Sequence, residues 1–252
     1  LSQLTQTTVI YNFRQNDIQN GGEGAPLAPI FHKALVKQIK IELPVCILNI
    51  GGISNVTIIG DYEQNNFTSR DLGPGNCLID AWVRKNNKGS YDENGAFAKQ
   101  GKTNNLMLNQ ALDNFDNRPD KNRLSFDTND FDISFLKGIN FEDGAATLTD
   151  LSGRIIGAGL FTLLNKVSNK LCKVLVSGGG RKNQTLIERI KSRTLKNLII
   201  QPIDDYNIDG DFVESQAFAY LAIRSYLKLP ISFPTTTRCK KAISGGDILK
   251  NF

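Results

Sequence analysis

The sequence predicts an α/β protein in which helices flank a parallel sheet. Residues 45–83 have the pattern of three strands followed by a helix, and residues 145–227 alternate between helical and strand patterns. Such alternation is typical of parallel strands joined by covering helices. The chain has 252 residues, 40% of them hydrophobic, which is enough to bury a substantial core.

Composition and charge exclude several other classes. The formal net charge is +5 and the basic residues are scattered, whereas nucleic-acid binding needs a concentrated basic face, so we expect no nucleic-acid partner. The longest apolar stretch, residues 155–164, is shorter than the roughly 20 residues of a membrane span. Residues 1–6 show no signal-peptide pattern, so we expect a cytoplasmic protein without a membrane partner.

Cysteine and histidine content argues against a metal centre. The four cysteines lie far apart without a CxxC pair, and the chain has a single histidine, His32. Cys46 and Cys172 lie inside apolar runs, which indicates reduced, buried thiols. We therefore assign no metal ligand from the sequence.

The first segment of the chain combines a strand, a glycine-rich turn and a helix. Residues 7–11 are rich in β-branched and aromatic side chains, which predicts a strand. Residues 21–24 contain three glycines and mark a turn. Apolar residues then recur at helical spacing from Phe31 to Ile39, which predicts a helix there.

The clearest pattern is a series of three consecutive strands. Residues 45–50 form a continuous apolar strand, and Gly51 and Gly52 follow it as a tight turn. Further strands are expected at residues 55–60 and 67–72, separated by a second polar turn.

A helix is expected directly after the third strand. Asn76 is a suitable N-cap, and one face of the helix is apolar: Leu78, Ile79, Trp82 and Val83. We assign Trp82 to the core rather than to a ligand platform. Asp80 on the same helix, and Glu214 on a later one, are expected to face solvent.

The rest of the chain is an irregular middle followed by ordered elements. Residues 85–137 are polar and weakly periodic, which predicts short helices and loops of an insertion or second lobe. After it we expect a helix from residue 145 to about 170, a buried strand at 172–176, a helix capped by Asn183, a strand at 198–200, and a helix at 213–227 that turns Ala217, Phe218, Leu221 and Ala222 inward.

Two glycine turns end predicted strands: Gly51 and Gly52, and Gly178, Gly179 and Gly180. Glycine lets backbone N–H groups approach an anion closely, and a helix N-terminus adds partial positive charge. Neither turn matches a P-loop or a GxGxxG fingerprint, and either one alone is more often a simple turn. Together they suggest two halves of a nucleotide clamp, the first for the phosphates and the second for the nucleoside.

Asp17 is the candidate catalytic carboxylate. It precedes the glycine-rich turn and follows Arg14 by three residues. A carboxylate near a cation suits a general base that activates a hydroxyl or water beside phosphate charge. The simpler interpretation is a solvated ion pair in a loop. Asp71, beside a Gly-Pro-Gly turn, could be a ligand or a residue that satisfies backbone amides.

Several segments form a specific series along nearly the whole chain. They are residues 13–17 (FRQND) with 21–27 (GGEGAPL), 48–57 (LNIGGISNVT), 71–76 (DLGPGN) with 79–82 (IDAW), 143–149 (DGAATLT), 177–180 (SGGG) with Asn183, and 214–219 (ESQAFA). In this order they resemble the anhydro-N-acetylmuramic acid kinase family.

The resemblance implies a fold and a reaction. The fold is the actin/hexokinase-like (ribonuclease H-like) one, with two α/β lobes and ATP in the cleft between them. The reaction is hydrolysis of the 1,6-anhydro ring of anhydro-N-acetylmuramic acid and phosphorylation of O6, which yields N-acetylmuramic acid 6-phosphate and ADP in bacterial cell-wall (peptidoglycan) recycling. The implied cofactors are ATP and Mg²⁺, and family members resemble homodimers.

The resemblance also implies site residues. Asp17 resembles the base that deprotonates the attacking water, and Arg14 resembles a sugar-binding neighbour. Gly51 and Gly52 resemble the family's second phosphate loop. Four further residues resemble its adenosine-side motif: Gly178, Gly179, Gly180 and Asn183. Such a reaction needs one base and a phosphate cradle but no covalent nucleophile. We expect these residues to face a single cleft.

The sequence departs from the family pattern in several places. Family members extend further at the N-terminus, where they carry a first phosphate loop that is not found here. Asn12 replaces an Asp, the Pro-Lys-Ser motif is eroded at residues 119–125, and Arg238 follows Thr236 and Thr237 where the family has Gly.

These departures predict an incomplete N-terminal lobe. We assign residues 1–42 and about 229–252 to its remainder, and residues 43–228 to the C-terminal lobe, with an insertion at about 86–140. A strand near Val9 is then expected to be unpaired and an apolar face uncovered. The chain looks truncated and is expected to be a weak or inactive kinase by itself, unless a partner chain supplies the missing segment.

Two other functions remain open at this point. The chain could be an inactive remnant or a nucleotide-binding module of the same fold. It could also be a different sugar or acetate kinase, although the pattern around Asp17 and Arg14 favours the anhydro-sugar family.

Overall fold

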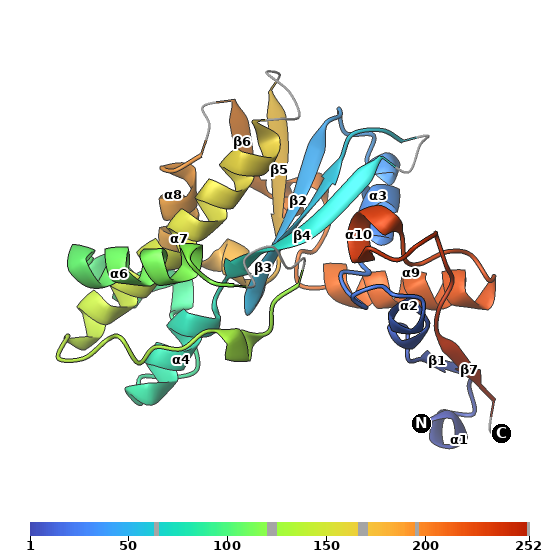
Figure 1. The fold of residues 1–252 in the computed structure, drawn as a ribbon, viewed down its shortest axis with the longest axis horizontal. Helices are drawn as coiled ribbons and strands as arrows, with labels where there is room; N and C mark the ends of the chain where they lie inside the picture. The colour runs from blue at the N-terminus through green and yellow to red at the C-terminus, as the bar shows by residue number, and fades with distance from the viewer. Residues whose placement is uncertain (63–65, 120–124, 166–170, 195–196, 251–252) are drawn as a thin grey trace. The chain divides into compact units, whose positions relative to one another are not determined.

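The structure, a computed structural model, describes residues 1–62, 66–119, 125–165, 171–194 and 197–250 (Figure 1). The chain divides into two compact units. Unit 1 comprises Leu1–Leu43, Thr57–Arg70 and Phe212–Phe252, and unit 2 comprises Pro44–Val56 and Asp71–Asp211. Among the described residues, no helix is long and apolar enough to cross a membrane.

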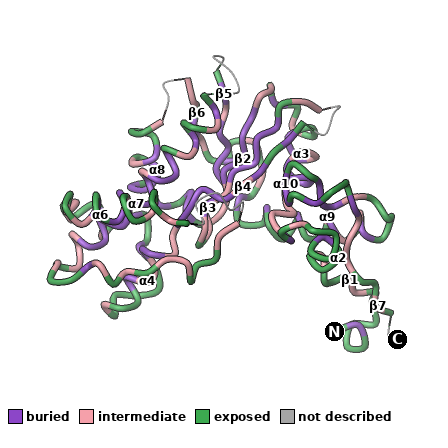
Figure 2. Tube along the Cα trace, in the orientation of Figure 1, coloured by how far each residue is buried: buried purple, intermediate pink, exposed green. Residues whose placement is uncertain are grey.

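A five-stranded sheet has the order β4-β3-β2-β5-β6. Its strands are β2 (Val45–Ile50), β3 (Ile53–Ile59), β4 (Phe67–Pro74), β5 (Cys172–Ser177) and β6 (Leu198–Pro202). β2, β5 and β6 run parallel, whereas β3 returns beside β2 after a tight turn, so the sheet is mixed. β2 is buried along almost its whole length (Figure 2), which explains its continuous apolar sequence.

Unit 2 contains the longer helices of the chain's middle. They are α4 (Cys77–Lys85), α5 (Ala96–Gln100), α6 (Asn105–Asp116), α7 (Phe141–Leu164) and α8 (Gln184–Lys191), with 3₁₀ turns η1 (Glu93–Gly95), η2 (Thr128–Asp130), η3 (Gly179–Lys182) and η4 (Ile203–Tyr206). The N-caps of α6, α7 and α8 are asparagines whose side chains accept a backbone N–H, and they fix where these helices begin: Asn104, Asn140 and Asn183.

α7 is the central helix of unit 2. A Cβ built on Gly153 would lie 2.6 Å from the Cβ of Arg189 on α8, and one on Gly159 would lie 2.8 Å from Leu72 on β4. These small residues therefore let α7 approach both elements closely. α7 also shares an apolar cluster with α4, α5 and α6, whose buried members include Leu78, Trp82, Ala98, Leu108 and Leu148.

Unit 1 is built from elements at both ends of the chain. They are α1 (Ser2–Thr5), β1 (Val9–Tyr11), α2 (Gln15–Gln19), α3 (Pro29–Gln38), α9 (Val213–Tyr226), α10 (Pro234–Thr237) and β7 (Asp247–Leu249). β1 pairs antiparallel with β7, with Ile10 opposite Ile248, so the expectation of an unpaired strand near Val9 is wrong. The chain's last strand supplies the missing partner.

α9 has one buried side and one exposed apolar side. Ala217 and Leu221 are buried, as predicted, but Phe218 is 48% exposed, so its predicted inward position is wrong. Its ring only borders that of Phe13, at a centroid distance of 6.0 Å. Ile223 and Tyr226 are also largely exposed, so much of the apolar surface of α9 faces outward.

A buried polar chain connects α3 to the sheet strands within unit 1. His32 Nδ1 lies 2.8 Å from the Thr57 hydroxyl, which lies 3.3 Å from the Ser69 hydroxyl. All three residues are buried. Burial lowers the pKa of His32 from its usual 6.5 to about 4, so the ring is neutral at physiological pH.

Most predicted elements are confirmed, with shifted ends. β4 continues to Pro74, and α7 begins at Phe141 because Asn140 caps it. The predicted end of this helix near residue 170 and most of the 119–125 motif lie outside the described residues. Asn76 occupies the N-cap position of α4, but its side chain does not cap the helix. The predicted lobe boundaries stay a prediction.

Candidate nucleotide site and candidate catalytic carboxylate

The two predicted glycine turns lie side by side in unit 2. β2 and β5 are parallel up to the pair of Asn49 and Ser177, so both turns leave the same edge of the sheet. A Cβ on Gly180 would lie 2.2 Å from Ile50 Cγ2, and one on Gly178, where φ is +78°, would lie 2.4 Å from Asn49 Oδ1. Glycine at these two positions is thus required by the contact between the second turn and the end of β2, directly before the first turn.

The first turn is held by the start of α4. The backbone N–H groups of Asn76 and Cys77 donate to the carbonyls of Gly51 and Gly52, at 2.8 and 3.1 Å. Gly75 N–H donates to Gly52 O at 2.9 Å. The Gly51–Gly52 turn is therefore pinned to a helix N-terminus, and its backbone conformation is defined without side chains.

The second turn is held by a buried arginine. Arg181 donates to Asp204 through Nε at 2.7 Å, to Asp211 through Nη1 at 2.6 Å, and from Nη1 to the Gly178 carbonyl at 3.1 Å. The hydrogen bonds from Arg181 lower the pKa of Asp204, and those from Arg181 and Lys182 lower the pKa of Asp211 to about 2. A network of charged side chains therefore holds the second turn in place: Arg181, Lys182, Asp204 and Asp211.

A cavity of about 420 Å³ opens beside the second turn. Its lining comes from α4, the segment before η1, and η3: Asn76, Asp80, Arg84, Ser90, Tyr91, Asp92, Asn94, Gly179, Lys182 and Asn183. Gly95 permits this arrangement, because a Cβ there would lie 2.3 Å from Asn183 Oδ1. The cavity has the size of a small-molecule site and contains two of the predicted residues, Gly179 and Asn183.

Two carboxylates of this cavity differ in their surroundings. Asp92 is buried and accepts from the N–H groups of Phe97 and Ala98, at 2.8 and 3.0 Å. Asp80, expected to face solvent, is instead half-buried in the cavity wall, so that prediction is wrong. Burial raises the pKa of Asp80 to about 6; Arg84 opposes this increase and Asp92 adds to it.

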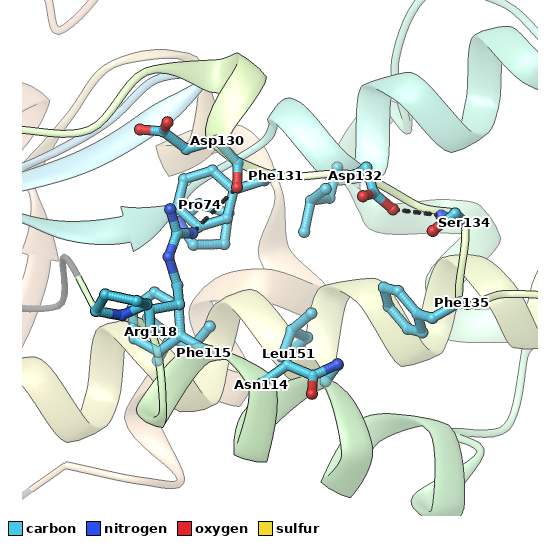
Figure 3. A pocket seen from close by; sticks show the side chains of 14 residues that line it. Pro74, Asn114, Phe115, Arg118, Asp130, Phe131, Asp132, Ser134, Phe135 and Leu151 are labelled. Carbon is cyan, nitrogen blue, oxygen red and sulfur yellow. Dashed lines mark hydrogen bonds between the residues drawn. The ribbon is translucent and has the colours of Figure 1, made fainter.

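Unit 2 also holds a second, more apolar cavity, of about 560 Å³ (Figure 3). Phe115, Phe131 and Leu151 line it, and the Arg118 guanidinium lies 4.7 Å from the ring centroid of Phe131. Arg118 Nη1 donates to the Asp130 carbonyl at 3.1 Å. None of the predicted site residues lines this cavity, so we assign the candidate site to the first one.

Asp17 lies in unit 1 and is 1% exposed. Its Oδ2 accepts from Gly24 N–H and its Oδ1 from the Thr237 hydroxyl, both at 2.7 Å. A Cβ on Gly22 would lie 2.1 Å from Asp17 Oδ2, so the glycine turn closes directly over the carboxylate. The solvated ion pair with Arg14 is wrong: Arg14 is exposed, and Asp17 is buried in hydrogen bonds to the backbone and a hydroxyl.

Arg238, where the sequence departs from the family pattern near the C-terminal end, helps to hold the segments around Asp17. Arg238 adopts φ +60°, a left-handed conformation that favours glycine, and its guanidinium pairs with Glu23 at 3.0 Å. Glu23 N–H also donates to the Thr237 carbonyl at 2.8 Å. The α10 segment and the glycine-rich turn thus hold Asp17 between them.

Asp71 acts as an acceptor for a distant amide. It is buried, and its Oδ2 accepts from Phe126 N–H at 2.7 Å. Of its two predicted roles, this favours that of a residue that satisfies a backbone amide, although the amide comes from a distant part of the chain. Among the described residues, no group of three or more His, Cys, Asp or Glu side chains could hold a metal ion.

The structure brings Gly51 and Gly52 together with Gly178, Gly179, Gly180 and Asn183. Asp17 and Arg14 belong to the other unit, so their convergence with the glycine turns stays a prediction. Sequence reasoning missed Asp80 and Thr237 as site residues. The only signals for them were their positions inside the 79–82 and 236–238 motifs.

Comparisons with known proteins show the family of the chain. A family model described as anhydro-N-acetylmuramic acid kinase matches residues 1–251. Proteins of that name from Pelagibacter ubique and Zymomonas mobilis are 54% and 38% identical over 252 and 250 residues. These alignments cover 100% and 98% of this chain and 67% and 65% of those relatives, so the chain spans about two thirds of their length.

One solved structure is more distantly similar. The activator of 2-hydroxyisocaproyl-CoA dehydratase from Clostridium difficile, with bound ADPNP, has a TM-score of 0.42 and 14% identity. The match covers 76% of this chain and 63% of that one, and this level of similarity is too low to carry an argument.

The chain is an α/β protein with a candidate ligand site at the carboxyl ends of two parallel strands, where the two glycine turns begin. The chain belongs to the anhydro-N-acetylmuramic acid kinase family.

Proposed function

We propose that this chain works in an ATP-dependent kinase that hydrolyses the 1,6-anhydro ring of anhydro-N-acetylmuramic acid and phosphorylates O6. The products are N-acetylmuramic acid 6-phosphate and ADP, in the cytoplasmic recycling of bacterial peptidoglycan. Family membership supports the reaction. The single observation that carries the proposal is the joined pair of glycine turns beside a cavity of about 420 Å³.

The proposed fold is actin/hexokinase-like, with two α/β lobes. We assign residues 43–228 to the C-terminal lobe, with an insertion at about 86–140. Residues 1–42 and about 229–252 belong to the N-terminal lobe, which further residues complete in the family. A homodimer, or a partner chain that supplies the rest of this lobe, is part of the proposal.

The glycine turns fit a triphosphate. A Cβ at Gly179 would meet no protein atom within 4 Å, so packing inside the protein does not require glycine there. Gly179 lines the cavity, and an open backbone there lets an anion approach. Mg²⁺ in such sites is held largely by phosphate oxygens and water, and we assign no protein ligand to it.

Asp17 is the proposed general base. It would accept a proton from the water that attacks the anomeric carbon, while the bond from that carbon to O6 breaks and frees O6 for phosphorylation. Gly24 N–H and the Thr237 hydroxyl orient the carboxylate, and each of its oxygens retains a second lone pair. Arg14, exposed near it, is the proposed sugar-binding neighbour.

Two glycine substitutions test the site. In Gly179→Val the new Cβ meets no protein atom within 4 Å, so we expect the unliganded protein to keep its melting temperature but to need far more ATP for the same stabilisation. In Gly180→Ala the methyl group clashes with Ile50, so the melting temperature should fall without ligand.

The readouts are thermal stabilisation by ATP and transfer of phosphate to the anhydro sugar. Equal ATP response in Gly179→Val and the unsubstituted chain would contradict the proposed site. Stabilisation by ATP without any phosphate transfer in the complete protein would favour the alternative, a non-catalytic nucleotide-binding module.

A further inference from the structure

Asp80 lies in the first turn of α4, near Arg84 on the same helix. It is half-buried in the wall of the 420 Å³ cavity, yet no hydrogen bond or salt bridge to its side chain occurs among the described residues. Taking a carboxylate partly out of water without donors costs free energy. Asp92, in the same wall, has part of this cost offset by two backbone N–H donors, although burial still raises its pKa.

The charged side chains around the cavity restrict where the phosphates of a nucleotide can lie. Its lining follows α4 from Asn76, beside the Gly51–Gly52 turn, past Asp80 to Arg84. Gly179 and Lys182 line it from η3. Lys182 is paired with Asp211 and Arg84 lies near Asp80, so the groups that repel phosphates in this part of the cavity are the carboxylates of Asp80 and Asp92.

Because these two carboxylates repel phosphates, we expect a nucleotide in the cavity to place its uncharged half against Asp80. An ionised carboxylate is only an acceptor, so its partner must carry a donor. A nucleoside offers two kinds: the ribose hydroxyls and the exocyclic amine of the base. The phosphates offer none.

We propose that Asp80 is a specificity-determining residue that accepts a hydrogen bond from a donor of the nucleoside half of ATP. The proposal rests on the ATP site proposed above and names the group that reads the nucleoside. The carboxylate is left without a protein donor because the ligand supplies one.

The test measures nucleotide affinity by calorimetry in the complete protein, unsubstituted, with Asp80→Asn, or with the control Asp113→Asn, which removes an exposed carboxylate from α6. Asn keeps an acceptor oxygen but loses the charge that strengthens the hydrogen bond, so we expect an affinity loss of about 10-fold for ATP in Asp80→Asn, and no change in the control. Titration with 2′-deoxyATP, 3′-deoxyATP and ITP identifies the donor. The analogue that lacks it should bind weakly to the unsubstituted chain and equally weakly to Asp80→Asn.

Stability separates ligand recognition from a structural role. A carboxylate without donors destabilises the unliganded protein at neutral pH, so Asp80→Asn should keep or raise the melting temperature while it weakens binding. A structural carboxylate would show the reverse. ATP affinity of the unsubstituted chain should also fall between pH 7 and pH 5, more than in Asp80→Asn, which retains the other charged groups of the cavity: Arg84, Asp92 and Lys182.

The outcomes are distinct. If the complete protein shows no binding of ATP at any concentration, the proposed function is overturned and this inference with it. If ATP binds and Asp80→Asn binds all four nucleotides as the unsubstituted chain does, only the role of Asp80 is overturned.

Discussion

Asp17 in unit 1 and Asp80 in unit 2 are both withdrawn from solvent, but the protein surrounds them differently. Asp17 is 1% exposed and has a donor on each oxygen, whereas Asp80 is half-buried and has none among the described residues. The segments around Asp17 come from opposite ends of the chain and close over it. The walls around Asp80 leave a cavity in front of it.

The difference separates two uses of a carboxylate. A fully bonded carboxylate is held in one orientation, which suits a base that must meet a substrate proton in one place. A carboxylate in a cavity without protein donors can have its hydrogen bonds satisfied by a ligand that binds there. Substitutions that remove the charge at each position should therefore have opposite effects on the free protein.

The largest effect is expected from Asp17→Asn. If Asp17 is the base, turnover of the anhydro sugar in the complete protein should fall about 10²- to 10⁴-fold. ATP affinity should be retained, because the glycine turns are untouched. Coupled assays of ADP release, with calorimetry for ATP, measure both quantities. Unchanged turnover would mean that Asp17 has only a structural role, and the functional difference between Asp17 and Asp80 would then be wrong.

The next prediction concerns the pH dependence of the unfolding free energy, to which His32 in unit 1 and Asp80 in unit 2 contribute with opposite signs. Because His32 has its pKa lowered to about 4 by burial, the unfolded chain binds more protons between pH 4 and 6.5, and stability should rise by about 3 kcal/mol over this window. Asp80 has its pKa raised to about 6 by burial, so it acts in the opposite direction between pH 4 and 6. Urea unfolding should therefore show a steeper rise with pH in Asp80→Asn. A flatter rise would contradict one of the two assignments.

Removal of one donor from Asp17 should have a smaller effect. Thr237→Val keeps the shape of the side chain but leaves Oδ1 of a buried carboxylate without its hydroxyl donor, so we expect a loss of about 1–3 kcal/mol in unfolding free energy. Thr237→Ser retains the hydroxyl and should recover most of the loss, including any loss of turnover. Equal stability of all three proteins would show that Thr237 does not support Asp17.

The smallest effect is expected from Arg238→Gly. Glycine relieves the left-handed backbone of Arg238, which costs about 1–2 kcal/mol, but it removes the partly exposed pair with Glu23, which contributes about 0–1 kcal/mol. The free energy of unfolding should change by less than about 2 kcal/mol, towards greater stability. A large loss would mean that the Glu23 pair, rather than the Thr237 hydroxyl, holds the turn over Asp17.

Local patterns predicted the elements that depend on local sequence. β2 was predictable because both of its faces are buried and its residues are continuously apolar, and α8 because Asn183 caps it. The meeting of the two glycine turns followed from the parallel order of their strands. In each case the information lies within a few residues of the feature.

The missed features depend on contacts between distant segments. Asp80 lies on the polar side of α4, which normally faces solvent, but the segment before η1 and the η3 turn build a wall over it. Thr237 is 220 residues from Asp17 in sequence. β1 was expected to be unpaired because the missing N-terminal segment was thought to supply its neighbour, but its partner is β7 at the far end of the chain. No periodicity within one segment indicates such contacts.

The outward apolar side of α9 has a practical consequence for every experiment above. Phe218, Ile223 and Tyr226 are 48%, 59% and 56% exposed, and exposed apolar side chains on one helix favour self-association. Light scattering across a dilution series should therefore precede calorimetry, and titrations should be run at the lowest protein concentration that gives a signal. Fusion to a highly charged carrier domain offers a second way to keep the sample monodisperse.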